Sequence, residues 1–145
     1  MEKILYLTDF SEVADRALDF VVQMKDCGEK NVVMLHVVDA RDLTPSFGWD
    51  RSVDPKKLEE GLEDRAAHKM EALKERLEQF DFTVRVRIEI GIPLQEIIRI
   101  QSEEAISDII MGSHGVTNVK EMVLGSVAEK VMRKSSCNVH IIRRE

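Results

Sequence analysis

The residues most able to do chemistry lie in one run, GSHGVTNVKEMVLGS, at positions 112–126. Its glycines stand at 112, 115 and 125, and Gly125-Ser126 directly precedes a helical pattern. This spacing is neither the Walker phosphate-binding loop nor the dinucleotide-binding fingerprint. Glycine lets a ligand approach the main chain closely, and a helix N-terminus attracts phosphate through its free N–H groups and its dipole. We therefore interpret the run as a nucleotide site, with turn formation as the alternative role of the same glycines.

Strands and helices alternate along the chain and must position this run. Strands are predicted from apolar runs at 3–8, 31–38, 82–90, 107–111 and 137–143. Helices are predicted after the cap-forming Ser11, after Asp54-Pro55, after Gly91-Ile92-Pro93 and from about residue 125 to 134. This order predicts one α/β domain, residues 1–145, with a parallel sheet and helices on both of its faces. The strand at 82–90 alternates apolar and polar residues, which indicates an edge of the sheet or a position under thin cover.

In a parallel sheet of this kind, ligands bind beyond the carboxyl ends of the strands, where the strand order reverses. Two strand ends carry suitable residues, Thr8-Asp9 after the first strand and Gly112-Ser113 after the fourth. Asp9 could contact a ligand there or simply cap the following helix. His114 could be a general base, but no acid or nucleophile accompanies it in the sequence, so a loop-filling role or a hydrogen bond to the ligand is favoured. We identify no catalytic residues.

Composition and charge exclude several classes of function. The chain has 145 residues, of which 43% are apolar and 33% charged, and its net charge is -6. The negative charge argues against a broad nucleic-acid or membrane-surface footprint, and no apolar stretch reaches the roughly 20 residues of a membrane span. Cys27 and Cys137 form no paired motif and the histidines match no metal-ligand spacing, so no metal site in the protein is predicted. The first residues lack the pattern of a signal peptide, which predicts a cytoplasmic location.

The spacing Gly112-x2-Gly115-x9-Gly125-Ser126 resembles the ATP-binding signature of the universal stress protein family. MGSHG at 111–115, LGSVAEKVMRKS at 124–135, ILYLTDFSEVADRAL at 4–18 and LHVVD at 35–39 are also similar to segments of that family. The resemblance implies a flavodoxin-like (Rossmann-like) three-layer α/β/α fold with a five-stranded parallel sheet in the order 3-2-1-4-5. It further implies ATP between the first and fourth strands, with Mg²⁺ or Mn²⁺ held by the phosphates, and a homodimer joined through the last strand.

The resemblance also assigns individual residues to the nucleotide. Asp9 would contact the ribose, the main chain of Val38 would contact the adenine, and Gly125, Ser126 and Val127 would hold the phosphates. The complete set of nucleotide-binding residues that it implies is Leu7, Thr8, Asp9, Val38, Met111, Gly112, Ser113, His114, Gly115, Thr117, Asn118, Gly125, Ser126 and Val127. Three positions depart from the usual family pattern: Leu7 stands where many members have proline, Val116 where a basic residue is common, and Asn138 where proline is usual early in the last strand.

These observations favour an ATP-binding stress-response sensor or regulator that acts through nucleotide-dependent interactions of a dimer. One alternative is an enzyme, either a slow ATPase or a phosphoryl- or nucleotidyl-transferase. The sequence lacks a P-loop lysine, paired metal-binding carboxylates and an evident base, so we expect at most slow hydrolysis. The other alternative is a nucleotide-free interaction module of the same fold. In the long loop at 39–54, Trp49 could form a lid over the base or a plug over the edge of the core.

Overall fold

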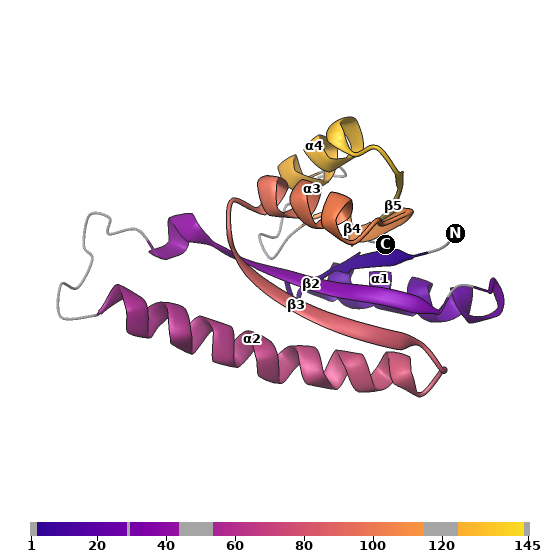
Figure 1. Ribbon diagram of the computed structural model, residues 1–145, viewed down its shortest axis with the longest axis horizontal. Helices are drawn as coiled ribbons and strands as arrows, with labels where there is room; N and C mark the ends of the chain where they lie inside the picture. Colours follow the sequence, from indigo (N-terminus) through magenta and orange to yellow (C-terminus); the bar gives the residue numbers. More distant parts are fainter. Residues whose placement is uncertain (1–2, 29, 44–53, 115–124, 144–145) are drawn as a thin grey trace.

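A five-stranded parallel sheet with helices on both faces forms the body of the protein (Figure 1). The computed structural model describes residues 3–28, 30–43, 54–114 and 125–143. The strands are β1 (Ile4–Leu7), β2 (Asn31–Asp39), β3 (Thr83–Gly91), β4 (Asp108–Gly112) and β5 (Asn138–Ile142). The helices are α1 (Glu12–Gln23), α2 (Pro55–Glu78), α3 (Pro93–Glu103) and α4 (Ser126–Lys134), with short 3-10 segments η1 (Met24–Asp26) and η2 (Ala40–Leu43). The strand order β3-β2-β1-β4-β5 confirms the predicted flavodoxin-like architecture.

Two apolar cores lie on opposite faces of the sheet. The side chains of a strand point alternately to the two faces, so Ile4 and Tyr6 enter one core while Leu5 and Leu7 enter the other. The first core is closed by α1 and α2, and the second by α3 and α4 (Figure 1). Burying each large apolar side chain contributes about 1.5–3 kcal/mol, so the central strand β1 is held from both sides. In the described part of the chain, no helix is both long and apolar enough to cross a membrane.

The N-terminal caps of the four helices differ, and they decide which helix amides are already hydrogen-bonded. The Ser11 hydroxyl accepts a hydrogen bond from the Ala14 N–H at 3.2 Å, which confirms the predicted cap of α1. The Asp54 carboxylate accepts from the Lys56 N–H at 3.0 Å and Pro55 follows it, which confirms the predicted start of α2. The cap residues of α3 and α4 are Ile92 and Gly125, and neither provides a side-chain hydrogen bond. The first three amides of α4 therefore remain available for other acceptors, as do the amides of the first turn of α3 after Pro93, which has no N–H.

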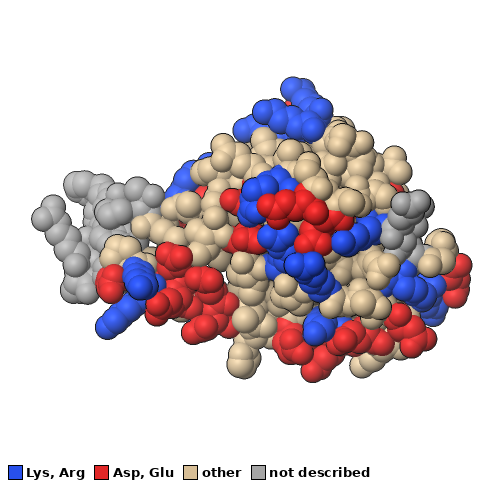
Figure 2. Space-filling view, in the orientation of Figure 1, with Lys and Arg blue, Asp and Glu red and all other residues tan. Residues whose placement is uncertain are grey.

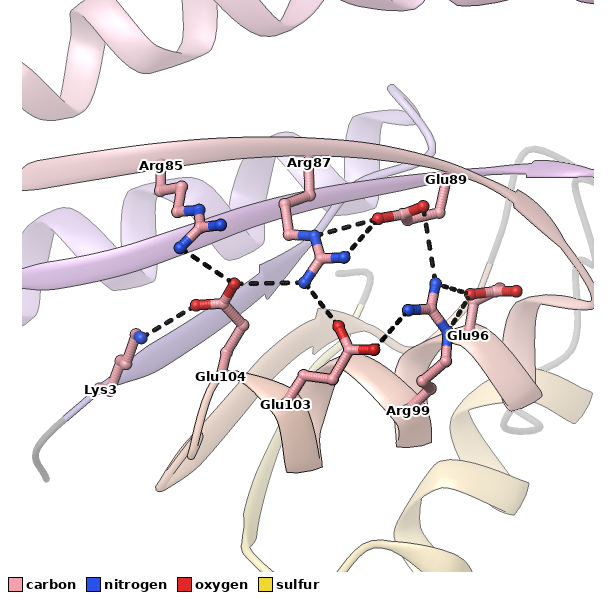
Figure 3. Close-up of polar contacts among 8 residues, drawn as sticks. All are labelled: Lys3, Arg85, Arg87, Glu89, Glu96, Arg99, Glu103 and Glu104. Carbon is pink, nitrogen blue, oxygen red and sulfur yellow. Dashed lines mark hydrogen bonds and ion pairs between the residues drawn. The ribbon is translucent and has the colours of Figure 1, made fainter.

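An eight-residue ionic network joins the edge strand β3 to the end of α3 (Figure 3). Its members are Lys3, Arg85, Arg87, Glu89, Glu96, Arg99, Glu103 and Glu104. Figure 2 shows basic and acidic side chains intermingled in the middle of one face of the molecule, over β3 and α3. The predicted edge position of this strand is confirmed, and its polar residues meet charged partners rather than water alone.

Glu104 is the most buried member of this ionic network. Its side chain is 6% exposed and its carboxylate lies 3.0 Å from Lys3 Nζ and 3.2 Å from Arg87 Nη1. The hydrogen bond from Lys3 holds the pKa of Glu104 below its usual value. Because the ionised form is preferred in the folded state, this carboxylate stabilises the fold above its unfolded pKa, and the contribution is lost as the pH falls through the lowered folded pKa.

We expect Glu104→Gln to lower the free energy of unfolding by about 1–3 kcal/mol at neutral pH, because Lys3 and Arg87 lose a shielded charged acceptor. The loss should shrink as the pH falls through the lowered pKa of Glu104, where the parent carboxyl also becomes protonated. Urea denaturation at several pH values measures both effects. Glu129→Gln is the matched control, because it breaks an exposed pair with Arg133 and should cost less than about 1 kcal/mol. Equal losses in the two variants at neutral pH would contradict the prediction.

Candidate functional site

A cavity of about 650 Å³ opens at the carboxyl ends of β1, β2 and β4. Its walls come from residues 7–10, 35–39 and 111–114 at the ends of these strands and from residues 125–128 at the start of α4. The other lining residues are Ala14 of α1, Asp42 of η2, Leu62, Arg65, Ala66 and Lys69 of α2, and Pro93 and Ile97 of α3. The strand order reverses between β1 and β4, which is where doubly wound sheets bind their ligands. The volume falls in the usual range of sites for small molecules and cofactors.

The predicted site residues that the structure describes all line this cavity. They are Leu7, Thr8, Asp9, Val38, Met111, Gly112, Ser113, His114, Gly125, Ser126 and Val127. The remaining predicted residues, Gly115, Thr117 and Asn118, lie outside the described residues, as does Trp49. The fold thus brings together residues from both ends of the chain, and their role in binding a nucleotide stays a prediction.

The turn between β1 and α1 is held by the two polar residues that end the strand. Thr8 Oγ1 accepts from the Phe10 N–H at 2.9 Å, and Asp9 Oδ1 accepts from the Ser11 N–H at 3.0 Å. Phe10 adopts a left-handed conformation with φ of 65°, which is unusual for a bulky residue and depends on these bonds. Asp9 therefore holds the turn before α1, whereas the helix cap, the alternative role considered for Asp9, is provided by Ser11. Its second oxygen, Oδ2, has no hydrogen-bond partner among the described residues, and Asp9 lines the cavity.

The α2 side of the cavity contains residues that the sequence interpretation missed. His36 Nδ1–H donates to the Thr8 carbonyl at 2.8 Å, and the imidazole packs against the Phe10 ring with centroids 4.5 Å apart. Burial lowers the pKa of His36, which favours its neutral form. Lys69 Nζ lies 5.0 Å from the centre of the Phe10 ring, and Arg65 lines the cavity one turn earlier on α2. In the sequence these two cations belong to a charged helix face, so no local signal distinguishes them from ordinary surface residues.

The glycine run holds the start of α4 against the end of β4. The Ser113 N–H donates to the Ile142 carbonyl at 2.8 Å, and the Ser113 carbonyl accepts from the Gly125 N–H at 2.7 Å. In this structure the Gly125 amide is already bonded to the Ser113 carbonyl, and its role in holding phosphate stays a prediction. The Glu129 N–H donates to the Gly125 carbonyl at 3.0 Å, so the helix leaves the amides of residues 126–128 without intrahelical acceptors. The amides that remain open to an anion therefore begin at Ser126.

Ser113 and His114 form a side-chain pair beside this helix start. Ser113 Oγ and His114 Nδ1 lie 2.8 Å apart, at hydrogen-bonding distance. His114 Nε2 is buried and has no hydrogen-bond partner among the described residues. A buried polar atom without a partner costs free energy, and in native proteins it calls for an explanation such as strain, a functional role, or a bound water molecule or ion. Together with the open amides of α4, His114 gives this wall of the cavity the character of an anion site.

Close packing, rather than ligand binding alone, requires glycine at position 125. A Cβ atom there would lie 2.9 Å from the Ser113 carbonyl oxygen and 3.4 Å from His114 Cα. We expect Gly125→Ala to lower the free energy of unfolding by about 1–3 kcal/mol, because the start of α4 must move away from β4.

Gly61→Ala is the matched control for this substitution. Gly61 lies within α2, and a Cβ atom there would meet nothing within 4 Å. Alanine at this position should raise the stability by about 0.5–1 kcal/mol, because it improves helix propensity. Thermal and urea denaturation of the two variants compares the effects. A Gly125→Ala protein as stable as the parent would show that the Ser113–Gly125 contact does not constrain the site.

Sequence and structure comparisons place the chain among known proteins. Residues 1–143 match the model of the family described as the universal stress protein family. The universal stress protein MJ0577 of Methanocaldococcus jannaschii is 41% identical over 155 residues, which cover 99% of this chain and 96% of that protein. The solved structure of MJ0577 matches with a TM-score of 0.88 at 42% identity, over 99% of this chain and 96% of the other.

Two more distant structures share the fold and are described with ligands. A universal stress protein family protein from Arabidopsis thaliana with AMP bound matches with a TM-score of 0.72 at 15% identity, over 100% of this chain and 93% of the other. A universal stress protein in complex with cAMP matches with a TM-score of 0.68 at 17% identity, over 98% and 96% of the two chains. The fold, the family model and the identity to MJ0577 agree, and the chain belongs to the universal stress protein family.

Proposed function

We propose that this protein binds an adenine nucleotide, ATP, in the cavity at the carboxyl ends of β1, β2 and β4, and acts as a stress-response sensor or regulator. The observation that carries the proposal is the wall formed by His114 and the start of α4. There, a buried imidazole nitrogen and the amides of residues 126–128 all lack acceptors within the described part of the protein. Phosphate oxygens would supply those acceptors.

The rest of the cavity suits a nucleoside. Leu7, Val37, Met111 and Ile97 surround its apolar part and belong to the core between the sheet and α3–α4. A flat base can bury apolar surface there while the main chain at the end of β2 offers polar groups to its edge. The free Oδ2 of Asp9 is a suitable acceptor for a ribose hydroxyl. AMP and cAMP in the two distant relatives support an adenine nucleotide as the class of ligand.

A regulatory role accounts for the site better than an enzymatic one. A phosphoryl-transfer enzyme needs groups that position the attacking atom and neutralise charge as it develops. His114 is bonded through Nδ1 to Ser113, and no carboxylate is in contact with it in the described part of the chain. The described residues contain no group of three or more His, Cys, Asp or Glu side chains able to hold a metal ion. Mg²⁺ or Mn²⁺ would therefore be held by the phosphates, and we expect at most slow hydrolysis.

The outer edge of β5 provides a surface for the proposed homodimer. β5 pairs with β4 on one side, and no described element covers its other side. Its residues Val139, Ile141 and Ile142 are only half-buried, although they are apolar. An open apolar edge tends to pair with another strand, and the same edge of a second copy would satisfy both chains.

Light scattering at micromolar concentration should therefore give the mass of a dimer. Amide hydrogen exchange in residues 138–142 should slow as the protein concentration rises, because pairing protects the main chain of the edge strand. Exchange in β3, the other edge, should stay independent of concentration and serves as the control. A monomer with concentration-independent exchange in β5 would contradict the proposed dimer.

A negative charge introduced at the start of α4 tests the proposed position of the phosphates, because it interacts favourably with the helix dipole and repels the ligand. Ser126 is the exposed first residue of α4, where an acidic side chain interacts favourably with the helix dipole. We expect Ser126→Asp to keep or raise the stability by up to about 1 kcal/mol, while repulsion between like charges weakens ATP binding by about tenfold or more. Calorimetric titration measures the affinity, and thermal denaturation measures the stability.

Gln95→Asp is the matched control, since it adds the same charge to the first turn of α3 at an exposed position outside the cavity wall. It should leave ATP affinity within about twofold of the parent, because exposed charges are screened by salt. If Ser126→Asp binds ATP as the parent does, the phosphates do not lie at α4.

A further inference from the structure

We propose that Ser113 is a positioning residue of the candidate nucleotide site. Its hydroxyl fixes one orientation and one tautomer of the His114 imidazole, so that Nε2–H is presented to an anionic group of the ligand at the start of α4. The inference rests on the proposed function, and it adds the protonation state on which recognition of the ligand depends.

Ser113 is held more rigidly than an ordinary loop residue. It is 1% exposed, its N–H donates to the Ile142 carbonyl at 2.8 Å, and its carbonyl accepts from the Gly125 N–H at 2.7 Å. These bonds tie the residue to β5 and to α4 at once. The hydroxyl group therefore has a fixed origin, and its contact with His114 Nδ1 at 2.8 Å is a property of the folded main chain.

Counting protons decides which partner donates in this pair. If Nδ1–H donated to Ser113 Oγ, the buried hydroxyl proton would have no acceptor among the described residues, which costs free energy. If Oγ–H donates to Nδ1 instead, the hydroxyl is satisfied and Nδ1 is the acceptor of the ring. A neutral imidazole carries one proton, so that proton then lies on Nε2.

The Nε2–H group would lie where an anion is stabilised by other groups. Nε2 is buried without a partner in the described part of the chain, and His114 lines the cavity. The His114 main chain is close to the α4 start, since a Cβ atom at position 125 would lie 3.4 Å from His114 Cα. A fixed donor beside the open amides of residues 126–128 is a preorganised arrangement, because binding requires no reorientation of the ring.

This arrangement predicts a particular dependence on pH. The imidazolium form donates from both nitrogens, so in either orientation of the ring it presents a donor to the anion. Only the neutral form needs Ser113 to select the orientation and the tautomer. Removing the hydroxyl should therefore weaken binding where His114 is neutral and matter little where it is protonated.

Other titratable groups that face the cavity must be separated from this effect. The charged and titratable side chains that line it beside His114 are Asp9, His36, Asp39, Asp42, Arg65 and Lys69. Asp39 is paired with Arg41, and His36 is the other group of the set whose type titrates near neutral pH. These groups and the phosphates of ATP are common to the parent and a Ser113 variant, so the ratio of the two affinities removes their contributions.

The first experiment measures the tautomer of His114 in the ligand-free protein. Long-range ¹H–¹⁵N spectra of ¹⁵N-labelled protein distinguish the protonated ring nitrogen from the unprotonated one. We expect a protonated Nε2 and an unprotonated Nδ1 in the parent near pH 8, and a loss of this single state in Ser113→Ala. Dominance of Nδ1–H in the parent would overturn the proposal whether or not ATP binds.

The second experiment measures ATP binding by calorimetric titration at two pH values, one where the ¹H–¹⁵N spectra show His114 neutral and a lower one where they show it protonated. We expect Ser113→Ala to weaken binding about fivefold at the higher pH and less than about twofold at the lower pH. Ser136→Ala is the matched control, since it removes a hydroxyl that accepts from Gln101 Nε2 at 2.7 Å away from the cavity. It should leave binding unchanged at both pH values. A loss in Ser113→Ala that is the same at both pH values would reduce Ser113 to a structural role. If the parent binds no ATP, the proposed function fails, while the tautomer measurement still decides the assignment of Ser113.

Discussion

The 2.7 Å hydrogen bond from the Gly125 N–H to the Ser113 carbonyl fixes the relation between the sheet and the last helix. It joins the end of β4 to the start of α4, and Ser113 is bonded at the same time to the end of β5. The approach is so close that no Cβ atom fits at position 125. The direction of α4 follows from this contact, and with it the place where the amides of residues 126–128 meet the cavity.

The cavity exists because the strand order reverses between β1 and β4. β2 lies on one side of β1 and β4 on the other, so the segments that follow their carboxyl ends diverge and leave space between them. The two walls differ chemically. His114 and the start of α4 form one side, whereas Arg65 and Lys69 on α2 bring positive charges to the other side, where Lys69 lies near Phe10. In the proposed function, directional recognition of an anion would be concentrated at the α4 wall.

The ionic network connects α3, which lines part of the cavity, to β3 at the edge of the sheet. α3 contributes Pro93 and Ile97 to the cavity wall, and its other end joins β3 through Glu103 and Arg87 at 3.0 Å (Figure 3). Charged side chains on β3 also discourage pairing of this edge with another chain, while the apolar β5 edge carries no comparable protection. The β3 edge is thus suited to solvent, and the β5 edge to pairing with another strand.

Local sequence determined much of this protein. Apolar periodicity set the order and type of the strands and helices, and Ser11 and Asp54-Pro55 marked two helix starts, because these signals act over a few residues. The glycine spacing at 112–126 also predicted the wall of the candidate site formed by β4 and α4. Only the tertiary structure decided that the Gly125 amide is bonded to Ser113, that His36 supports Thr8, and that Lys69 lies over Phe10. Each of these contacts joins residues from separate elements, so it depends on strand register, helix length and packing, which no short stretch of sequence contains.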